Sequence, residues 1–119
     1  MTNFYLGRGQ GTRDDLCSGI RAGVYVSDVR GAAWDGERLT VSVGEGTMIR
    51  DGRVAEPVRD FTLRGAGVDW LAGIEGVAGD FGWNRAASSC SRGIDGAVPV
   101  TDGAPHVRIR RLQVGGVTA

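Results

Sequence analysis

The chain has few of the side chains from which metal centres and nucleophilic sites are built. Among its 119 residues are one histidine and two cysteines, and all 14 of its basic residues are arginine. It contains no Cys-x-x-Cys pair and no pair of histidines, so a zinc site made from this chain alone has few candidate ligands. The glycine-rich stretch GRGQGTRDD has no lysine and places two acids where a phosphate would bind, which excludes a phosphate-binding loop.

Net charge and long apolar runs are also missing. The 14 basic residues balance 14 acidic ones, so the chain has no overall positive charge to attract nucleic acid. The nearby residues Arg108, Arg110 and Arg111 are best explained as a solvated strand face. We therefore expect no nucleic-acid partner. No apolar run approaches the roughly 20 residues that span a bilayer. The start MTNFYLGRGQGTRDD lacks the layout of a signal peptide. These features predict a cytoplasmic protein with no membrane partner.

The two cysteines call for different interpretations. In a reducing compartment Cys17 and Cys90 are expected to be free thiols or ligands, and not a disulfide. Cys17 lies beside the apolar stripe of a predicted helix and is expected to be a small packed side chain. Cys90 lies in a polar, glycine-punctuated loop. It could act as a nucleophile with His106 as its base, although His106 is more typical of an exposed strand residue, and spacing alone does not pair them.

Glycine is abundant, at 21 residues against about eight expected from average usage. The glycines separate short apolar segments, which is typical of turns in a sheet-rich domain. Helices are predicted over residues 12–21 and 67–77. The expected strands cover 22–31, 39–43, 47–50, 61–63, 97–100 and 106–114. We therefore predict one domain over residues 1–119, of the α+β class, with mainly antiparallel sheet (a meander, barrel-like or sandwich-like) and two short helices.

Turn signals divide the central part of the chain. Leu39, Val41 and Val43 alternate strictly, and a turn is expected at Glu45 and Gly46. Asp-Gly at residues 51 and 52 stands between two apolar runs, which is a strong signal for a hairpin.

The order of the segments resembles the C-terminal part of the TldD/PmbA family, cytosolic proteins similar to zinc metallopeptidases. MTNFYLGRGQGTRDDLCSGIRAGVYV is similar to the family's Met-Thr-Asn stretch with its glycine loop, short helix and Gly-Ile/Val-Tyr. GTMIRDGRVAEPVRDFTLRGAG and GVAGDFG resemble later family segments. SSCSRGIDGAVPVTDGAPHVRIRRLQVGG is similar to the terminal cysteine-glycine run and its Val-Gly-Gly tail.

This resemblance implies a role for Cys90. In the TldD branch a His-Glu-x-x-x-His helix supplies two zinc-binding histidines and a glutamate, and a cysteine at the position of Cys90 supplies a third ligand. Gly93 and Gly96 would then shape the loop that carries the thiol. The chain has no His-Glu-x-x-x-His, and Ser91-Arg92 replaces the family's Gly-Lys. It is therefore expected to be inactive by itself, with zinc bound only when histidines come from outside it.

The sequence supports two alternative hypotheses about function, which belong to different classes of protein. In the first, the chain is the C-terminal portion of a TldD-like zinc metallopeptidase that cleaves small or unfolded peptides. It would work with a TldD/PmbA-type partner subunit or with a missing N-terminal part. In the second, it is a non-catalytic remnant or a protein-binding module that associates with a partner subunit.

Overall fold

The chain forms two compact units. The computed structural model describes residues 3–84, 88–91 and 96–116. One unit, the small-sheet unit, contains residues 1–16 and 76–107, and the other, the meander unit, contains 17–75 and 108–119. That the whole of 1–119 is one domain stays a prediction.

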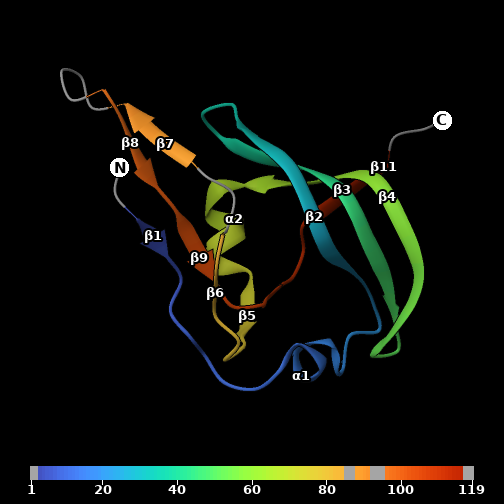
Figure 1. Ribbon diagram of the computed structural model, residues 1–119. Coiled ribbons are helices and arrows are strands. Elements are labelled where there is room, and N and C mark those ends of the chain that lie inside the picture. The colour runs from blue at the N-terminus through green and yellow to red at the C-terminus, as the bar shows by residue number, and fades with distance from the viewer. Residues whose placement is uncertain (1–2, 85–87, 92–95, 117–119) are drawn as a thin grey trace. The chain divides into compact units, whose positions relative to one another are not determined.

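The meander unit is built around an antiparallel four-stranded sheet of order β11-β4-β3-β2 (Figure 1). Its strands are β2 (Ala22–Trp34), β3 (Arg38–Arg50), β4 (Arg53–Ala66) and β11 (Gln113–Gly116). The predicted hairpin between β3 and β4 is confirmed: Asp51 and Gly52 have φ values of 49° and 77°, as a tight turn of this kind requires. Arg50 and Glu56 form an ion pair beside this turn, and the guanidinium lowers the pKa of Glu56 to about 2.

The core of the meander unit lies on the middle strands. Val43, Ile49 and Phe61 are buried, and Val43 pairs directly with Phe61. The turn predicted at Glu45 and Gly46 is wrong, because both residues continue β3 and pair with β4. Glycine at position 46 makes room for its neighbours within the strand. A Cβ there would lie 2.6 Å from the Tyr25 carbonyl oxygen and 3.1 Å from the Phe61 ring. Only a residue without a side chain lets the ring approach this closely.

Both predicted helices are present but shorter than expected. The first is α1 (Arg13–Cys17), and its Cys17 is a buried free thiol, as predicted. The second is α2 (Gly67–Ala72), which ends at Gly73. The residues beyond it form β5 (Ile74–Val77), which pairs with β10 (Val107–Ile109). Within the meander unit, Arg108 and Arg110 both pair with the Glu75 carboxylate, at 2.8 Å and 3.3 Å.

The small-sheet unit contains a three-stranded sheet of order β1-β9-β6. Its strands are β1 (Phe4–Tyr5), β9 (Asp102–Ala104) and β6 (Gly82–Trp83). A separate antiparallel hairpin consists of β7 (Ser88–Ser91) and β8 (Ala97–Val100), and β8 leads almost directly into β9 (Figure 1).

The predicted fold class is confirmed. Most of the described chain is antiparallel strand with two short helices, which is the expected α+β composition. Within the described ranges the sheets are not closed into a barrel, because the four-stranded sheet ends at β2 and β11.

Candidate functional site

Cys90 lies on the hairpin of the small-sheet unit. In the backbone register of β7 and β8, Cys90 is opposite Val98, and Ser91 is opposite Ala97. Gly93 lies outside the described residues. Gly96 has a φ of 72°, a left-handed conformation that favours glycine, and nothing lies within 4 Å of a Cβ built there. The loop-shaping roles of these two glycines stay predictions.

The hairpin is tied to the three-stranded sheet at its base. Thr101, the single residue between β8 and β9, donates its backbone N–H to Asn3 Oδ1 at 3.0 Å. Its hydroxyl donates to the Asn84 carbonyl oxygen at 2.8 Å. Asn84 in turn donates its backbone N–H to the Asp102 carbonyl at 2.7 Å and its side-chain amide to the Asp102 carboxylate at 3.1 Å. The segments that enter and leave the hairpin are therefore bonded to each other.

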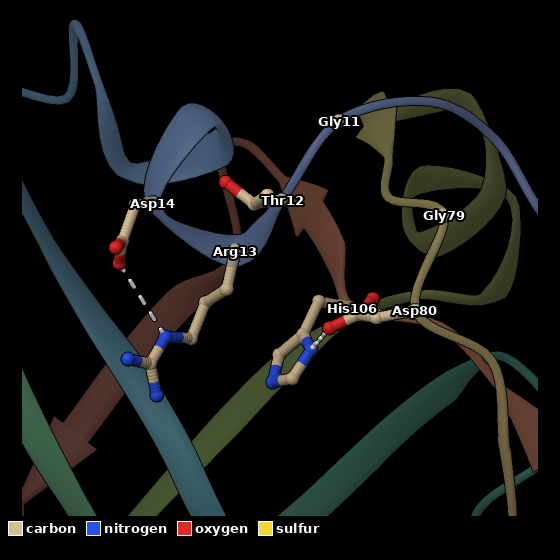
Figure 2. A pocket seen from close by; sticks show the side chains of 7 residues that line it. All are labelled: Gly11, Thr12, Arg13, Asp14, Gly79, Asp80 and His106. Atoms are coloured by element: carbon tan, nitrogen blue, oxygen red, sulfur yellow. Dashed lines mark hydrogen bonds and ion pairs between the residues drawn. The ribbon is translucent and has the colours of Figure 1, made fainter.

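At the other end of β9, a histidine and an aspartate form a closely bonded pair. Asp80 accepts the His106 backbone N–H at 3.1 Å with one oxygen, and with the other it contacts His106 Nδ1 at 2.5 Å (Figure 2). These contacts, the backbone N–H first and the imidazole second, hold the pKa of Asp80 below its ordinary value. A carboxylate in this position fixes the orientation of the imidazole ring.

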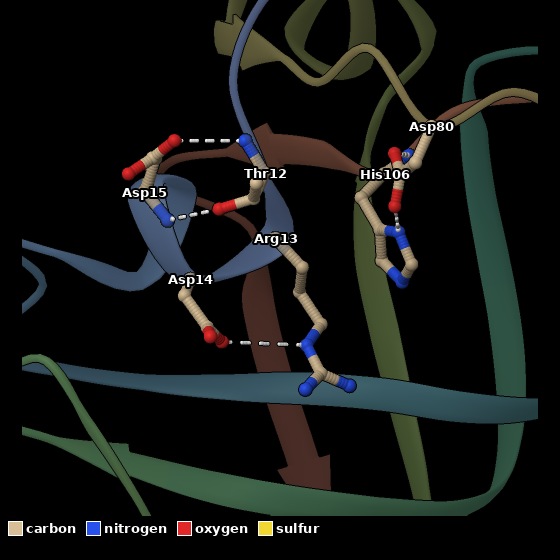
Figure 3. A network of polar contacts seen from close by, with 6 residues as sticks. All are labelled: Thr12, Arg13, Asp14, Asp15, Asp80 and His106. Atoms are coloured by element: carbon tan, nitrogen blue, oxygen red, sulfur yellow. Dashed lines mark hydrogen bonds and ion pairs between the residues drawn. The ribbon is translucent and has the colours of Figure 1, made fainter.

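This pair lines an open hollow of about 600 Å³ whose other walls are Gly11, Thr12, Arg13, Asp14 and Gly79. Arg13 and His106 extend their side chains toward the same side of the hollow (Figure 2). A reciprocal cap sets the start of α1: Thr12 N–H donates to Asp15 Oδ2 at 2.8 Å, and Asp15 N–H donates to Thr12 Oγ1 at 3.2 Å (Figure 3). The cap holds the first turn of α1, from which Arg13 projects.

The backbone does not favour a cysteine–histidine pair. Val98, which is opposite Cys90, precedes His106 by eight residues of mostly extended chain, about 25 Å at the usual rise of a strand. The β8 and β9 arrows continue in one direction (Figure 1). His106 instead contacts Asp80, an aspartate in the GVAGDFG segment that no pattern in the sequence singles out.

The metal-binding capacity of the described residues is limited. Among them, no three His, Cys, Asp or Glu side chains are grouped so that they could hold a metal ion. A catalytic zinc site takes three protein ligands. A cysteine thiolate is a donor that suits zinc.

Neither helix in the described part of the chain has the length or the apolar character that a membrane crossing requires.

Comparison with known proteins gives consistent matches. The family described as the PmbA/TldA metallopeptidase C-terminal domain matches residues 1–116. A metalloprotease of Synechocystis sp. is 42% identical over 119 residues, which are 100% of this chain and 26% of the relative. A metalloprotease of Methanothermobacter thermautotrophicus is 39% identical over 118 residues, 98% of this chain and 25% of the relative. A zinc metalloprotease TldD homolog of Saccharolobus solfataricus is 29% identical over 117 residues, 98% of this chain and 26% of the relative.

Two solved structures share the fold. A Thermotoga maritima protein described as a modulator of a DNA gyrase has a TM-score of 0.69 and 23% identity over 93% of this chain and 23% of its own. TldE from Thermococcus kodakarensis has a TM-score of 0.63 and 18% identity over 94% of this chain and 23% of its own. The chain spans about a quarter of the length of the curated relatives that it matches.

Proposed function

Because the chain belongs to the family of PmbA/TldA metallopeptidase C-terminal domains, we propose that it is the C-terminal portion of a TldD-like zinc metallopeptidase that cleaves small or unfolded peptides. The observation that carries the proposal is the match to relatives named metalloproteases over essentially the whole of this chain, at up to 42% identity. These relatives are about four times longer. Most of the catalytic apparatus would therefore lie outside these 119 residues.

In this proposal Cys90 supplies one zinc ligand. A thiolate is a common zinc ligand, and a zinc ion with three protein ligands binds a water molecule and lowers its pKa toward neutrality. The chain's own contribution is to hold the strand that carries Cys90, through its pairing with β8. The missing donors, two histidines and a general-base glutamate, would come from a longer polypeptide or from a partner subunit.

The second candidate is a binding module without catalysis. The specific observation in its favour is exposed apolar surface: on α2, Val68 and Leu71 are 70% and 75% exposed. Exposed apolar side chains on one helix suit an interface with another protein. This surface also suits packing against the rest of a larger metallopeptidase, so it does not by itself separate the two candidates.

The experiment is to purify the native polypeptide in which this chain occurs, with any subunit that accompanies it, and to measure its mass, zinc content and peptide hydrolysis. We expect Cys90→Ser to lose zinc and hydrolysis by about 100-fold or more, since a direct ligand should matter at least as much as the groups that orient ligands. Cys17→Ala is the matched control. Cys17 is a buried residue, so this variant should retain both zinc content and peptide hydrolysis.

Two results would contradict the proposal. A native polypeptide of 12.5 kDa that carries no zinc, alone or with its subunits, would favour the binding module. A zinc-containing peptidase in which Cys90→Ser has wild-type metal content would remove Cys90 from the ligand set.

A further inference from the structure

The two ends of the Cys90 hairpin meet at one small hydrogen-bonded cluster. Asn84 is the last described residue before β7, and Thr101 follows β8 directly. The Thr101 hydroxyl donates to the Asn84 carbonyl oxygen at 2.8 Å, so the residues on either side of the hairpin are joined by a side-chain bond. We call Asn3, Asn84 and Thr101 the hairpin clamp.

The clamp holds Thr101 from both neighbouring strands. On the β1 side, Asn3 Oδ1 accepts the Thr101 backbone N–H at 3.0 Å, and the Thr101 carbonyl accepts the Phe4 N–H at 3.1 Å. On the β6 side are the Thr101 hydroxyl bond to Asn84 and the two bonds from Asn84 to Asp102. The Asn3 side chain thus takes the place of a backbone partner for Thr101, because the pairing of β1 with β9 starts at Phe4 and Asp102.

The position of the clamp makes it a device for orientation more than for stability. Its side-chain hydrogen bonds are exposed to solvent, where a single bond adds little to the free energy of unfolding. They act, however, at the only residue between β8 and the central strand of the sheet, next to the buried Val100. A small rotation there would displace the whole of β8 and the paired β7.

We propose that Asn3, Asn84 and Thr101 are positioning residues that fix the direction of the β7–β8 hairpin and so place Cys90. The functional consequence rests on the proposed zinc-ligand role of Cys90. A ligand must be held to within about 0.5 Å of its working geometry, and supporting groups around metal ligands carry large effects on affinity. The clamp is the described feature of this chain that meets that need.

The first test uses a matched pair at one residue in the full zinc-loaded polypeptide with its partner subunit. Thr101→Val keeps the branched shape but removes the hydroxyl, whereas Thr101→Ser keeps the hydroxyl. We expect Thr101→Val to weaken zinc binding by roughly 10- to 100-fold in competition with a chelator, and Thr101→Ser to remain within about threefold of wild type. Substitution with Co²⁺ adds a spectroscopic readout, since the thiolate-to-cobalt absorption should change in Thr101→Val only.

A second pair tests the other side of the clamp. Asn3→Leu removes the oxygen that accepts the Thr101 N–H, and Asn3→Asp retains an oxygen at the same place. The control for loss of any exposed hydroxyl bond is Ser27→Ala, which removes a 3.1 Å bond to the Glu45 carbonyl in the meander unit. The control should leave zinc binding and the cobalt spectrum unchanged.

Hydrogen–deuterium exchange separates the clamp from the zinc hypothesis. With or without metal, amides of β7 and β8 should exchange roughly tenfold faster or more in Thr101→Val than in Thr101→Ser, while those of β3 and β4 stay unchanged. Unchanged exchange in both Thr101→Val and Asn3→Leu would overturn the clamp. Faster exchange together with unchanged zinc affinity would overturn its role in placing Cys90. If Cys90→Ser also keeps its zinc, the failure belongs to the proposed function.

Discussion

The tight turn between β3 and β4 depends on one residue without a side chain. Gly52 has a φ of 77°, a conformation in which a residue with a side chain is strained. There is space for a Cβ, because the nearest atom to it, the Cys17 carbonyl oxygen, would be 3.6 Å away. Gly52→Ala should therefore lower the free energy of unfolding by about 1–2 kcal/mol through backbone strain alone. Gly31→Ala is the control, since Gly31 has open space and no positive φ. Equal urea midpoints for the two variants would contradict this explanation.

The Asp80 carboxylate gives a second prediction for a single residue. Its pKa is lowered mainly by the His106 backbone N–H and secondarily by the imidazole. His106→Ala keeps the backbone N–H, so the pKa of Asp80 should rise only part of the way to its ordinary value of 3.8. Because folding lowers this pKa, the contacts stabilise the protein above pH 3.8 and are lost as the pH falls below it. An NMR titration of the Asp80 carboxyl carbon measures this. A full return to 3.8 would assign the effect to the imidazole.

Single residues were also the scale at which sequence reasoning worked best. The Asp51-Gly52 turn and the buried Cys17 follow from local chemistry, and both predictions are confirmed. Gly46 shows the limit: a glycine that permits a turn and a glycine that makes room for an aromatic ring look alike in a sequence. Only the pairing of β3 with β4 places the Phe61 ring against it.

At the scale of elements, a glycine allows aromatic rings to cover the small sheet. Tyr5 and Trp83 are the direct partners of Gly103 on either side. With Phe81 they form three edge-to-face pairs with centroids 5.0 to 6.0 Å apart. Flanking aromatics that lean over a glycine stabilise a sheet at a point where the glycine itself contributes no packing.

Gly103→Ala should therefore damage this sheet. The new Cβ would lie 2.7 Å from the Phe81 ring, 2.8 Å from Trp83 and 3.0 Å from the Gly82 carbonyl oxygen, which cannot rotate away. The overpacking should cost about 1–3 kcal/mol of unfolding free energy in denaturant titrations. Gly82→Ala, in the adjacent strand with nothing within 4 Å, should cost clearly less. A Gly103→Ala variant as stable as Gly82→Ala would show that the rings readjust freely.

Element boundaries failed where distant pairing decided them. Val68, Leu71 and Ile74 have helical spacing, yet Ile74 belongs to β5 because β10 offers it a strand partner more than 30 residues later. The hairpin clamp is even harder to predict from the sequence. Asn3 and Thr101 are 98 residues apart, and two isolated polar residues do not form a periodic pattern. A single sequence contains no signal for such a contact, although Asn3 stands in the Met-Thr-Asn stretch that resembled the family.

For the whole molecule, the order of weak motifs carried more information than any one motif. The TldD/PmbA family inferred from that order is confirmed, over residues 1–116. The site could not be predicted to the same depth, because a single cysteine does not specify a metal centre. The relatives' length suggests why: three quarters of each relative has no counterpart in these 119 residues.

That shortage of ligands gives the last prediction. The described residues contain no group of three metal-binding side chains, and one thiolate cannot hold zinc against dialysis. Under the proposed function, the isolated chain of 119 residues should therefore retain less than about one tenth of an equivalent of zinc, whereas the native polypeptide in which it occurs, with any subunit that accompanies it, should retain about one. Metal analysis after dialysis of both samples against the same buffer measures the difference, with circular dichroism confirming that the isolated chain is folded. Stoichiometric zinc in the folded isolated chain, lost in Cys90→Ser, would mean that this chain brings its own additional ligands to Cys90, and the histidine helix from outside would no longer be required.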